Sequence, residues 1–286
     1  MRSRAALATA VASLTLMLST QTSLAITKNY VADFDHPYVA MVAFYDATGS
    51  FSHRCTGSLI DASTMITAGH CVTDDNGGVM PSARVWFQQG AGTHYDPATQ
   101  HDPVTGYPDD CAAGTAGTLC TTSHRMFNYG YGGNFASDSH DMGLMILDAP
   151  IEMPVYAKLP AAGALDSLID KKGTQDRMLR VSGYGLSYKG PQKVTSYRER
   201  LMGDEQLINT TSAVTGGVNL QANGNGKDKA GTCNGDSGGP VFYPATSNTM
   251  VALTSFGLNE WCRGTDFAYR LDRAAPLAWI AEHRAH

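Results

Sequence analysis

The chain has 286 residues, 43% of them hydrophobic and 16% charged, an ordinary balance for a globular protein with a sizeable core in one large domain or two small ones. Lys and Arg number 21 against 26 Asp and Glu, so the formal net charge at pH 7 is -5. A nucleic-acid partner would need a basic face, and this charge balance argues against one.

Residues 1–25 are typical of a secretory signal peptide. Two arginines open the segment, an apolar run covers 5–18, and the small-x-small sequence SLA ends it. The run is short for a membrane span, and no later stretch reaches the roughly 18 apolar residues that a span requires. Because the segment contains two Arg and no acidic residue, its removal leaves 19 basic and 26 acidic residues, a net charge of -7. We therefore predict a secreted, extracellular protein with no membrane segment in its mature form.

Short runs of strand-forming residues then alternate with clusters of Gly, Asp, Asn and Ser. Many short strands with turn signals predict an all-β sandwich or barrel, and no strand–helix alternation of the parallel α/β kind is present. The predicted strands are Val39–Tyr45, Thr56–Ile60, Ser63–Thr67, Ala83–Gln88, Gly143–Leu147, Met178–Ser182, Arg200–Ile208, Gly239–Phe242, Met250–Phe256 and Phe267–Leu271.

Two segments differ from this pattern. Residues 90–134 are rich in Gly, Asp, Thr, Tyr and His and lack apolar periodicity, which predicts a long surface insertion. Residues 274–285 have apolar side chains at helical spacing, which predicts a closing C-terminal helix.

The cysteine pattern indicates disulfides rather than a metal. Six cysteines, an even number, predict three disulfides in an exported chain, although spacing alone leaves the pairing open. A bridge between Cys111 and Cys120 would pin the insertion. The chain has no C-x-x-C pair, so we expect no structural zinc, and we expect no other metal or cofactor.

The strongest chemical signal is the hexamer GDSGGP at residues 235–240. A serine hydroxyl is a weak nucleophile until a base accepts its proton. Glycines beside Ser237 let the backbone turn tightly enough for N–H groups to point at a developing oxyanion. The alternative interpretation of this hexamer alone is a glycine turn without chemistry.

Two further motifs offer the base and its partner. TAGHC at 67–71 places His70 directly after an apolar run, and an imidazole with a pKa of about 6.5 suits proton transfer at neutral pH. HDMGLMIL at 140–147 places Asp141 at the head of an apolar strand, where a buried carboxylate needs a partner such as a histidine N–H. Each residue alone would commonly be structural, so the hypothesis depends on their combination with Ser237.

With these motifs in the order His, Asp, Ser, the chain resembles the chymotrypsin–trypsin family of serine peptidases over nearly all of 26–286 outside the 90–134 segment. Subtilisins and α/β-hydrolases have other orders. The resemblance implies two packed antiparallel six-stranded β-barrels with a C-terminal helix. The N-terminal half, 26–165, would carry His70 and Asp141, and the C-terminal half, 166–286, would carry Ser237.

The resemblance further implies a secreted, monomeric serine endopeptidase acting on proteins or peptides. Ser237 would attack the scissile carbonyl, His70 would take its proton, and Asp141 would orient His70. The backbone N–H groups of Gly235 and Ser237 would form the oxyanion hole. The family's disulfides would correspond to the pairs Cys55–Cys71 and Cys233–Cys262.

Three more features are similar to family segments. SGYG at 182–185 has Tyr where the family has Trp, and TSFG at 254–257 places Phe256 at another such Trp position. The second segment implies that Ser255 contacts the buried aspartate and that the backbone of Ser255, Phe256 and Gly257 pairs with substrate. The family's activating ion pair would join the ammonium of a new terminus at Ile26 to Asp236, although Lys-Asn at 28–29 stands where the family often has glycine.

The preference for the residue before the scissile bond (P1) stays open. Gly231 occupies the position where trypsins carry the aspartate that selects Lys or Arg, and Gly231 with Thr232 would suit an apolar or aromatic side chain. Asp266, on the strand behind the pocket, would attract a basic side chain if it faces the pocket. The alternative is that Asp266 is exposed in the turn at 264–266.

Two other functions remain as alternatives: a catalytically silent binding or adhesion protein on the same fold, and a hydrolase acting mainly on esters. The presence of all three triad residues argues against the first. The second would use the same site. The sequon at Asn209 predicts glycosylation only in a eukaryotic secretory pathway.

Overall fold

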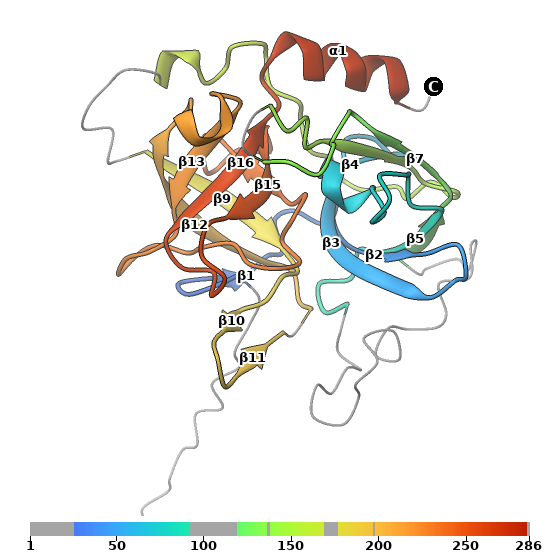
Figure 1. Ribbon diagram of the computed structural model, residues 1–286, viewed down its shortest axis with the longest axis horizontal. Helices are drawn as coiled ribbons and strands as arrows, with labels where there is room; N and C mark the ends of the chain where they lie inside the picture. Colours follow the sequence, from blue (N-terminus) through green and yellow to red (C-terminus); the bar gives the residue numbers. More distant parts are fainter. Residues whose placement is uncertain (1–25, 92–118, 136–137, 169–176, 197, 285–286) are drawn as a thin grey trace, which may run out of the picture.

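The computed structural model describes residues 26–91, 119–135, 138–168, 177–196 and 198–284. The predicted signal peptide therefore lies outside the described residues. Figure 1 shows two barrel-like sheets side by side, with one α-helix lying across one end of them. No helix in the described ranges is long and apolar enough to cross a membrane.

The first sheet is entirely antiparallel and has the strand order β6-β5-β2-β3-β4-β8-β7. Only His124 separates β6 from β7, so these two strands bring the ends of the sheet together. The strands are β2 (Val39–Tyr45), β3 (Phe51–Leu59), β4 (Thr64–Thr67), β5 (Ser82–Trp86), β6 (Cys120–Ser123), β7 (Arg125–Asn128) and β8 (Gly143–Ile146).

The second sheet has the order β1-β12-β13-β16-β15-β14-β9, and an added β12–β9 pairing closes six of its strands into a ring. The short strand β1 (Val31–Ala32) adds to the outside of β12. The ring strands are β9 (Met178–Gly183), β12 (Leu201–Asn209), β13 (Asn219–Asn223), β14 (Pro240–Phe242), β15 (Met250–Gly257) and β16 (Thr265–Arg270). The expected all-β fold of two antiparallel barrels is confirmed.

The remaining elements are short. Strands β10 (Tyr188–Lys189) and β11 (Val194–Thr195) form a separate hairpin. The 3₁₀ turns are η1 (Gly69–Cys71), η2 (Asp166–Leu168) and η3 (Ala213–Thr215). The helix α1 (Ala274–His283) buries Pro276 and Ile280, which confirms the predicted closing helix.

One expectation needs correction. Residues 120–128, which the sequence analysis assigns to a surface insertion, form β6 and β7 and pair with β5 and β8. Strand β6 has Thr and Ser where a typical barrel strand alternates apolar residues, which hid it in the sequence. Their hydroxyls are satisfied within the barrel: Ser123 Oγ donates to the carbonyl of Ile146 at 2.7 Å, and Thr122 Oγ1 donates to Asp148 at 2.6 Å. Residues 92–118 of the predicted insertion lie outside the described residues.

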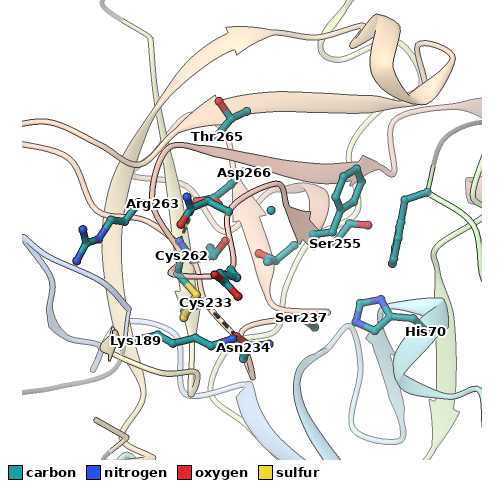
Figure 2. Close-up of a pocket in the computed structure, with 17 residues that line it drawn as sticks. His70, Lys189, Cys233, Asn234, Ser237, Ser255, Cys262, Arg263, Thr265 and Asp266 are labelled. Carbon is teal, nitrogen blue, oxygen red and sulfur yellow. Dashed lines mark hydrogen bonds between the residues drawn. A yellow bond between two sulfur atoms is a disulfide. The ribbon is translucent and has the colours of Figure 1, made fainter. Parts of the chain in front are cut away.

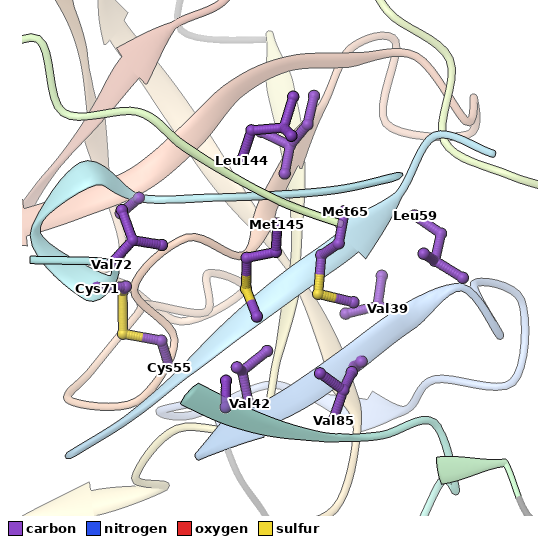
Figure 3. Close-up of a cluster of buried hydrophobic side chains, with 14 of the residues drawn as sticks. Val39, Val42, Cys55, Leu59, Met65, Cys71, Val72, Val85, Leu144 and Met145 are labelled. Carbon is purple, nitrogen blue, oxygen red and sulfur yellow. A yellow bond between two sulfur atoms is a disulfide. The ribbon is translucent and has the colours of Figure 1, made fainter. Parts of the chain in front are cut away.

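The first barrel is filled by aliphatic and sulfur-containing side chains from its strands (Figure 3). Strand β2 is buried along its whole length because it also contacts β9 of the second barrel. A separate cluster that includes Leu179, Leu201 and Leu220 fills the second barrel. Burying a Val, Leu or Met side chain contributes about 1.5–3 kcal/mol, so the two clusters form a firm frame for the loops between them.

Candidate active site

The sheet register brings His70 and Asp141 together. His70 lies in η1, directly after β4, and Asp141 lies directly before β8. Strands β4 and β8 are paired, with Thr67 opposite Gly143, so the end of one strand meets the start of the other. Two residues separated by 71 positions in the sequence thus come into contact.

The contact is a bidentate one between imidazole and carboxylate. His70 Nδ1 lies 3.0 Å from Asp141 Oδ2 and 3.1 Å from Oδ1. The backbone N–H of His70 also donates to Asp141 Oδ1 at 2.8 Å. The hydroxyl of Ser255 donates to Asp141 Oδ2 at 2.5 Å, which is the contact expected for this residue. The fully buried carboxylate is therefore satisfied on both oxygens.

These contacts set the charges of the pair. Burial alone would raise the pKa of Asp141, but the charge and hydrogen bond of His70 and the Ser255 hydroxyl lower it. Burial disfavours the charged form of His70, but the Asp141 carboxylate outweighs this and raises the pKa of the imidazole. The arrangement stabilises an imidazolium, the species that forms when a histidine accepts a proton from a nucleophile.

Two small residues allow this close approach. A Cβ on Gly69 would lie 2.8 Å from Tyr131 Cβ and 2.9 Å from the Met142 nitrogen. A Cβ on Gly143 would lie 2.9 Å from the Ala68 carbonyl oxygen. The glycines of TAGHC and HDMGLMIL are thus needed for packing η1 against the start of β8.

The loop that carries Ser237 belongs to the second barrel and is held against the first. Gly235 and Gly238 have φ angles of 99° and 77°, in the left-handed region that favours glycine. A Cβ on Gly238 would lie 2.0 Å from Thr67 Oγ1. The carbonyl of Ser237 accepts a hydrogen bond from the Thr56 N–H of β3 at 2.8 Å. GDSGGP therefore does form a tight glycine turn. In addition, Ser237 lines the same cavity as His70 (Figure 2).

Asp236 is buried beneath this loop. Its carboxylate accepts the Gly185 N–H at 2.7 Å and the Cys233 N–H at 2.9 Å. Burial nevertheless raises the pKa of Asp236 to about 7, because these hydrogen bonds and the nearby Arg54 offset only part of the desolvation. A carboxylate in this position would be stabilised by a further cation.

The segment at 26–29 is packed beside that loop. Ile26 is fully buried, and Thr27 exchanges backbone hydrogen bonds with Gly231 at 2.9 and 3.0 Å. Lys28 and Asn29 have φ angles of 61° and 40°, so they adopt the left-handed backbone that glycine takes without strain. Lys28 and Asn29 therefore differ from the family's usual glycine in residue type, but their backbone keeps a conformation that glycine favours.

A cavity of about 330 Å³ extends from Ser237 and His70 toward Asp266. Figure 2 shows Asp266 on the side of this cavity away from His70. The predicted substrate-binding residues Thr232, Ser255, Phe256, Gly257 and Asp266 all line it, and Gly231 is not among its lining residues. Gly231 lies behind the wall, where a Cβ would be 3.5 Å from Asp266 Oδ2.

The expectation that Asp266 might instead be exposed in a turn is wrong. Asp266 belongs to β16, opposite Gly257 of β15, and is only 9% exposed. Its Oδ2 accepts the Thr232 N–H at 2.9 Å. Because β16 already begins at Thr265, Asp266 is held in the strand and its carboxylate lines the cavity.

Sequence reasoning missed two sets of residues around the cavity. Aromatic rings surround His70: Tyr131 and Phe135 have centroids 5.9 and 5.8 Å from the imidazole, and Phe135 packs on Phe256. The other residue is Glu205, which is 2% exposed and interacts with Asp266. Its position among the inward residues of β12, in step with Leu201 and Leu207, is the sequence signal that reveals it.

Two of the predicted disulfides are present, Cys55–Cys71 beside the histidine and Cys233–Cys262 beside the cavity. Cys120 is also disulfide-bonded. The predicted pairing with Cys111 lies outside the described residues. Cys55 and Cys71 surround His70 closely, but their sulfurs are bonded to each other and are not thiolate ligands for a metal.

The curated relatives include proteins of insects and of an annelid. The chain is 24% identical to CLIP domain-containing serine protease B10 of Anopheles gambiae over 80% of this chain and 61% of that protein. It is 26% identical to trypsin zeta of Drosophila erecta, over 76% and 71% of the two chains. It is 28% identical to fibrinolytic enzyme isozyme C of Lumbricus rubellus, over 82% and 90%.

Solved structures agree on the fold. HL collagenase matches with a TM-score of 0.61 and 19% identity over 91% of this chain and 97% of that one. The scabies mite inactivated protease paralogue S-D1 matches with a TM-score of 0.59 and 16% identity over the same shares. The trypsin family model matches residues 29–278. The chain is therefore a member of the trypsin family.

Proposed function

We propose that this protein is an exported serine endopeptidase that cleaves peptide bonds through an acyl-enzyme. The observation that carries the proposal is the hydrogen-bonded chain from Ser255 through Asp141 to His70, with Ser237 lining the same cavity as the imidazole. In the proposed reaction, Ser237 Oγ attacks the scissile carbonyl while His70 accepts its proton. His70 then donates that proton to the leaving amine, and water releases the acyl group.

The glycine-rich loop supports the proposed oxyanion hole. The backbone N–H groups of Gly235 and Ser237 would stabilise the negative oxygen of the tetrahedral intermediate. The left-handed φ of Gly235 orients the peptide that follows it. The backbone of 255–257 would pair with the substrate as an added strand, which fits its position along the cavity.

Export and activation belong to the same proposal. Cleavage after residue 25 would free the amino group of Ile26, and its ammonium would pair with Asp236. Burial of Ile26, the Thr27–Gly231 pairing and the raised pKa of Asp236 support this assignment. We propose further that the mature enzyme is a secreted monomer that acts on proteins or peptides and has no nucleic-acid or membrane partner and no cofactor.

The buried carboxylate of Asp266 supports a preference for Lys or Arg at P1. It lines the side of the cavity away from His70, where the P1 side chain would reach. Water is scarce in such a site, so an ion pair there is stronger than one at the surface. An aromatic P1 side chain would leave this carboxylate without a cation.

Cleavage of a peptide library tests the reaction and the preference together. We expect cleavage after Lys or Arg by the chain beginning at Ile26, and none by its Ser237→Ala variant. Cleavage after aromatic residues instead would contradict the role of Asp266. Equal cleavage by the Ser237→Ala variant would show that the activity comes from another protein.

A silent homologue is the second candidate, and one observation favours it: a structural neighbour is an inactivated protease paralogue. That likeness, at 16% identity, concerns the fold. A folded chain beginning at Ile26 that cleaves neither peptide nor ester substrates would support this candidate. An ester-only enzyme would cleave the esters alone.

A further inference from the structure

Asp266, the carboxylate that lines the cavity, has the carboxyl group of Glu205 behind it. Glu205 and Asp266 are 2% and 9% exposed. Glu205 shares the inward face of β12 with Leu207, whose partner on β13 is Ala222. Ala222 is in turn opposite Asp266 on β16. Glu205 therefore reaches Asp266 from inside the second barrel.

One proton must lie between these groups. Two adjoining carboxylates do not both ionise in a dry site, and a carboxyl–carboxylate hydrogen bond needs one protonated partner. The side chains of Glu205 and Asp266 interact within hydrogen-bonding reach of each other. Glu205 Oε1 is buried without a hydrogen-bond partner.

Asp266 has the better site for the negative charge. Its Oδ2 accepts the Thr232 N–H at 2.9 Å, and the Thr232 side chain also contributes a hydrogen bond. Burial, and after it the charge of Asp266, raise the pKa of Glu205 well above its ordinary value. The proton consequently belongs to Glu205, whose neutral carboxyl donates to the Asp266 carboxylate.

Other charged groups lie around the pair. Asp236 raises the pKa of Glu205 through its charge, and it is the carboxylate proposed to pair with Ile26. The neighbours of Glu205 on β12 are paired with cations: Asp204 with Arg180 of β9 at 2.8 Å, and Gln206 with Lys229, which donates to it. The charged residues that line the cavity besides Asp266 are Lys189, Glu260 and Arg263.

We propose that Glu205 is a positioning residue for P1 specificity: its neutral carboxyl donates a hydrogen bond to Asp266 and keeps Asp266 as the carboxylate that receives a basic side chain. This inference rests on the proposed preference for Lys or Arg. Without the donor, only the Thr232 hydrogen bonds oppose the effect of burial on the pKa of Asp266. The pH at which Asp266 gains a proton and loses its negative charge then moves up toward 7.

Binding of p-aminobenzamidine tests the proposal without requiring catalysis. This fluorescent amidinium stays protonated throughout the range studied, and its affinity for the Ser237→Ala chain beginning at Ile26 would be titrated from pH 4 to 9. We expect affinity to fall on acidification as Asp266 gains a proton. The variant Glu205→Leu should move this midpoint up by about one pH unit, a tenfold change in proton affinity, because it removes the donor. Glu205→Gln keeps an N–H donor and should restore the wild-type midpoint.

The alkaline side provides a second readout that uses only the isosteric variant. Because the proton stays on Glu205 beside the ionised Asp266, amidine affinity of the wild type should stay flat above pH 7. The Glu205→Gln profile should stay flat as well. An Asp266→Asn control should abolish the fall in amidine affinity at acid pH. Any fall that remains would come from another group such as Asp236.

The outcomes separate this inference from the proposed function. Superimposable profiles for the wild type, Glu205→Gln and Glu205→Leu would overturn the role of Glu205. Absence of amidine binding by the wild type would overturn the basic P1 preference itself. In the active enzyme, the ratio of kcat/KM for Arg over Phe substrates should follow the same midpoints, since His70 affects both substrates equally and cancels.

Discussion

At the scale of single residues, burial and hydrogen-bond partners together set the pKa of each buried carboxyl group. Asp141 is fully buried yet its pKa is lowered, because His70 and Ser255 bond to it. Asp236 is also buried, but two backbone N–H groups and the charge of Arg54 leave its pKa raised to about 7. Similar burial therefore leads to opposite shifts, and the partners of each carboxylate determine the direction.

The raised pKa of His70 predicts the acid limb of the pH profile. The imidazole must be neutral to accept a proton, so kcat/KM should rise with pH through a midpoint above the ordinary value of about 6.5. Because the pKa is raised by Asp141, Asp141→Asn should move the midpoint down and lower kcat by about 10⁴-fold. A wild-type midpoint well below 6.5 would contradict the contact with Asp141, and steady-state kinetics from pH 5 to 9 measures it.

At the scale of secondary-structure elements, regular strands were predictable and irregular ones were not. Each of the ten predicted strands overlaps an observed one, because apolar runs ended by turn residues mark barrel strands. Strand β13 (Asn219–Asn223) was missed, since NLQAN has few β-branched or aromatic residues and its position comes from pairing with β12 and β16. The predicted division at 165/166 stays a prediction.

The site, like the strands, was predictable only where a local sequence pattern marks it. The motifs located His70, Asp141 and Ser237 because their chemistry requires particular residues at short spacing. Glu205 belongs to no motif, and its contact with Asp266 depends on the register of three strands. Such long-range pairing is set by the whole barrel rather than by local sequence.

The Cys55–Cys71 disulfide links β3 to η1, so its removal should affect the histidine. Replacing both cysteines by Ser should lower the free energy of unfolding by about 2–4 kcal/mol. We expect kcat to fall as well, because η1 positions His70. The matched control replaces Cys233 and Cys262, which border the cavity, and should mainly raise KM. Urea denaturation and kinetics on both double variants measure this, and unchanged kcat in the first would contradict the linkage.

At the scale of the whole molecule, the segment that begins at Ile26 packs into the second barrel, and both barrels hold the nucleophile loop. Ile26 belongs to the core of the second barrel, while Thr56 of the first barrel bonds to Ser237. A new terminus at Ile26 would therefore act on a loop that both barrels hold.

This arrangement predicts a pH dependence that differs before and after cleavage. The pKa of Asp236 is raised to about 7, so without a cation its burial favours the protonated form, and stability falls as pH rises from about 4 to 7. A chain that retains one residue before Ile26 should lose stability over this range and should be inactive. A chain beginning at Ile26 should lose less stability, because the Ile26 ammonium would favour the ionised form of Asp236. Equal urea midpoints and equal activity for the two chains would contradict the ion pair.

The most direct test of the proposed catalytic centre is covalent labelling of Ser237. The chain beginning at Ile26 would be treated with a fluorophosphonate, which reacts with activated serines, and analysed by peptide mass spectrometry. We expect one adduct, on Ser237, in the wild type and almost none in the His70→Ala variant. A folded wild-type chain that stays unlabelled, or that labels equally well without His70, would show that the three residues do not act together.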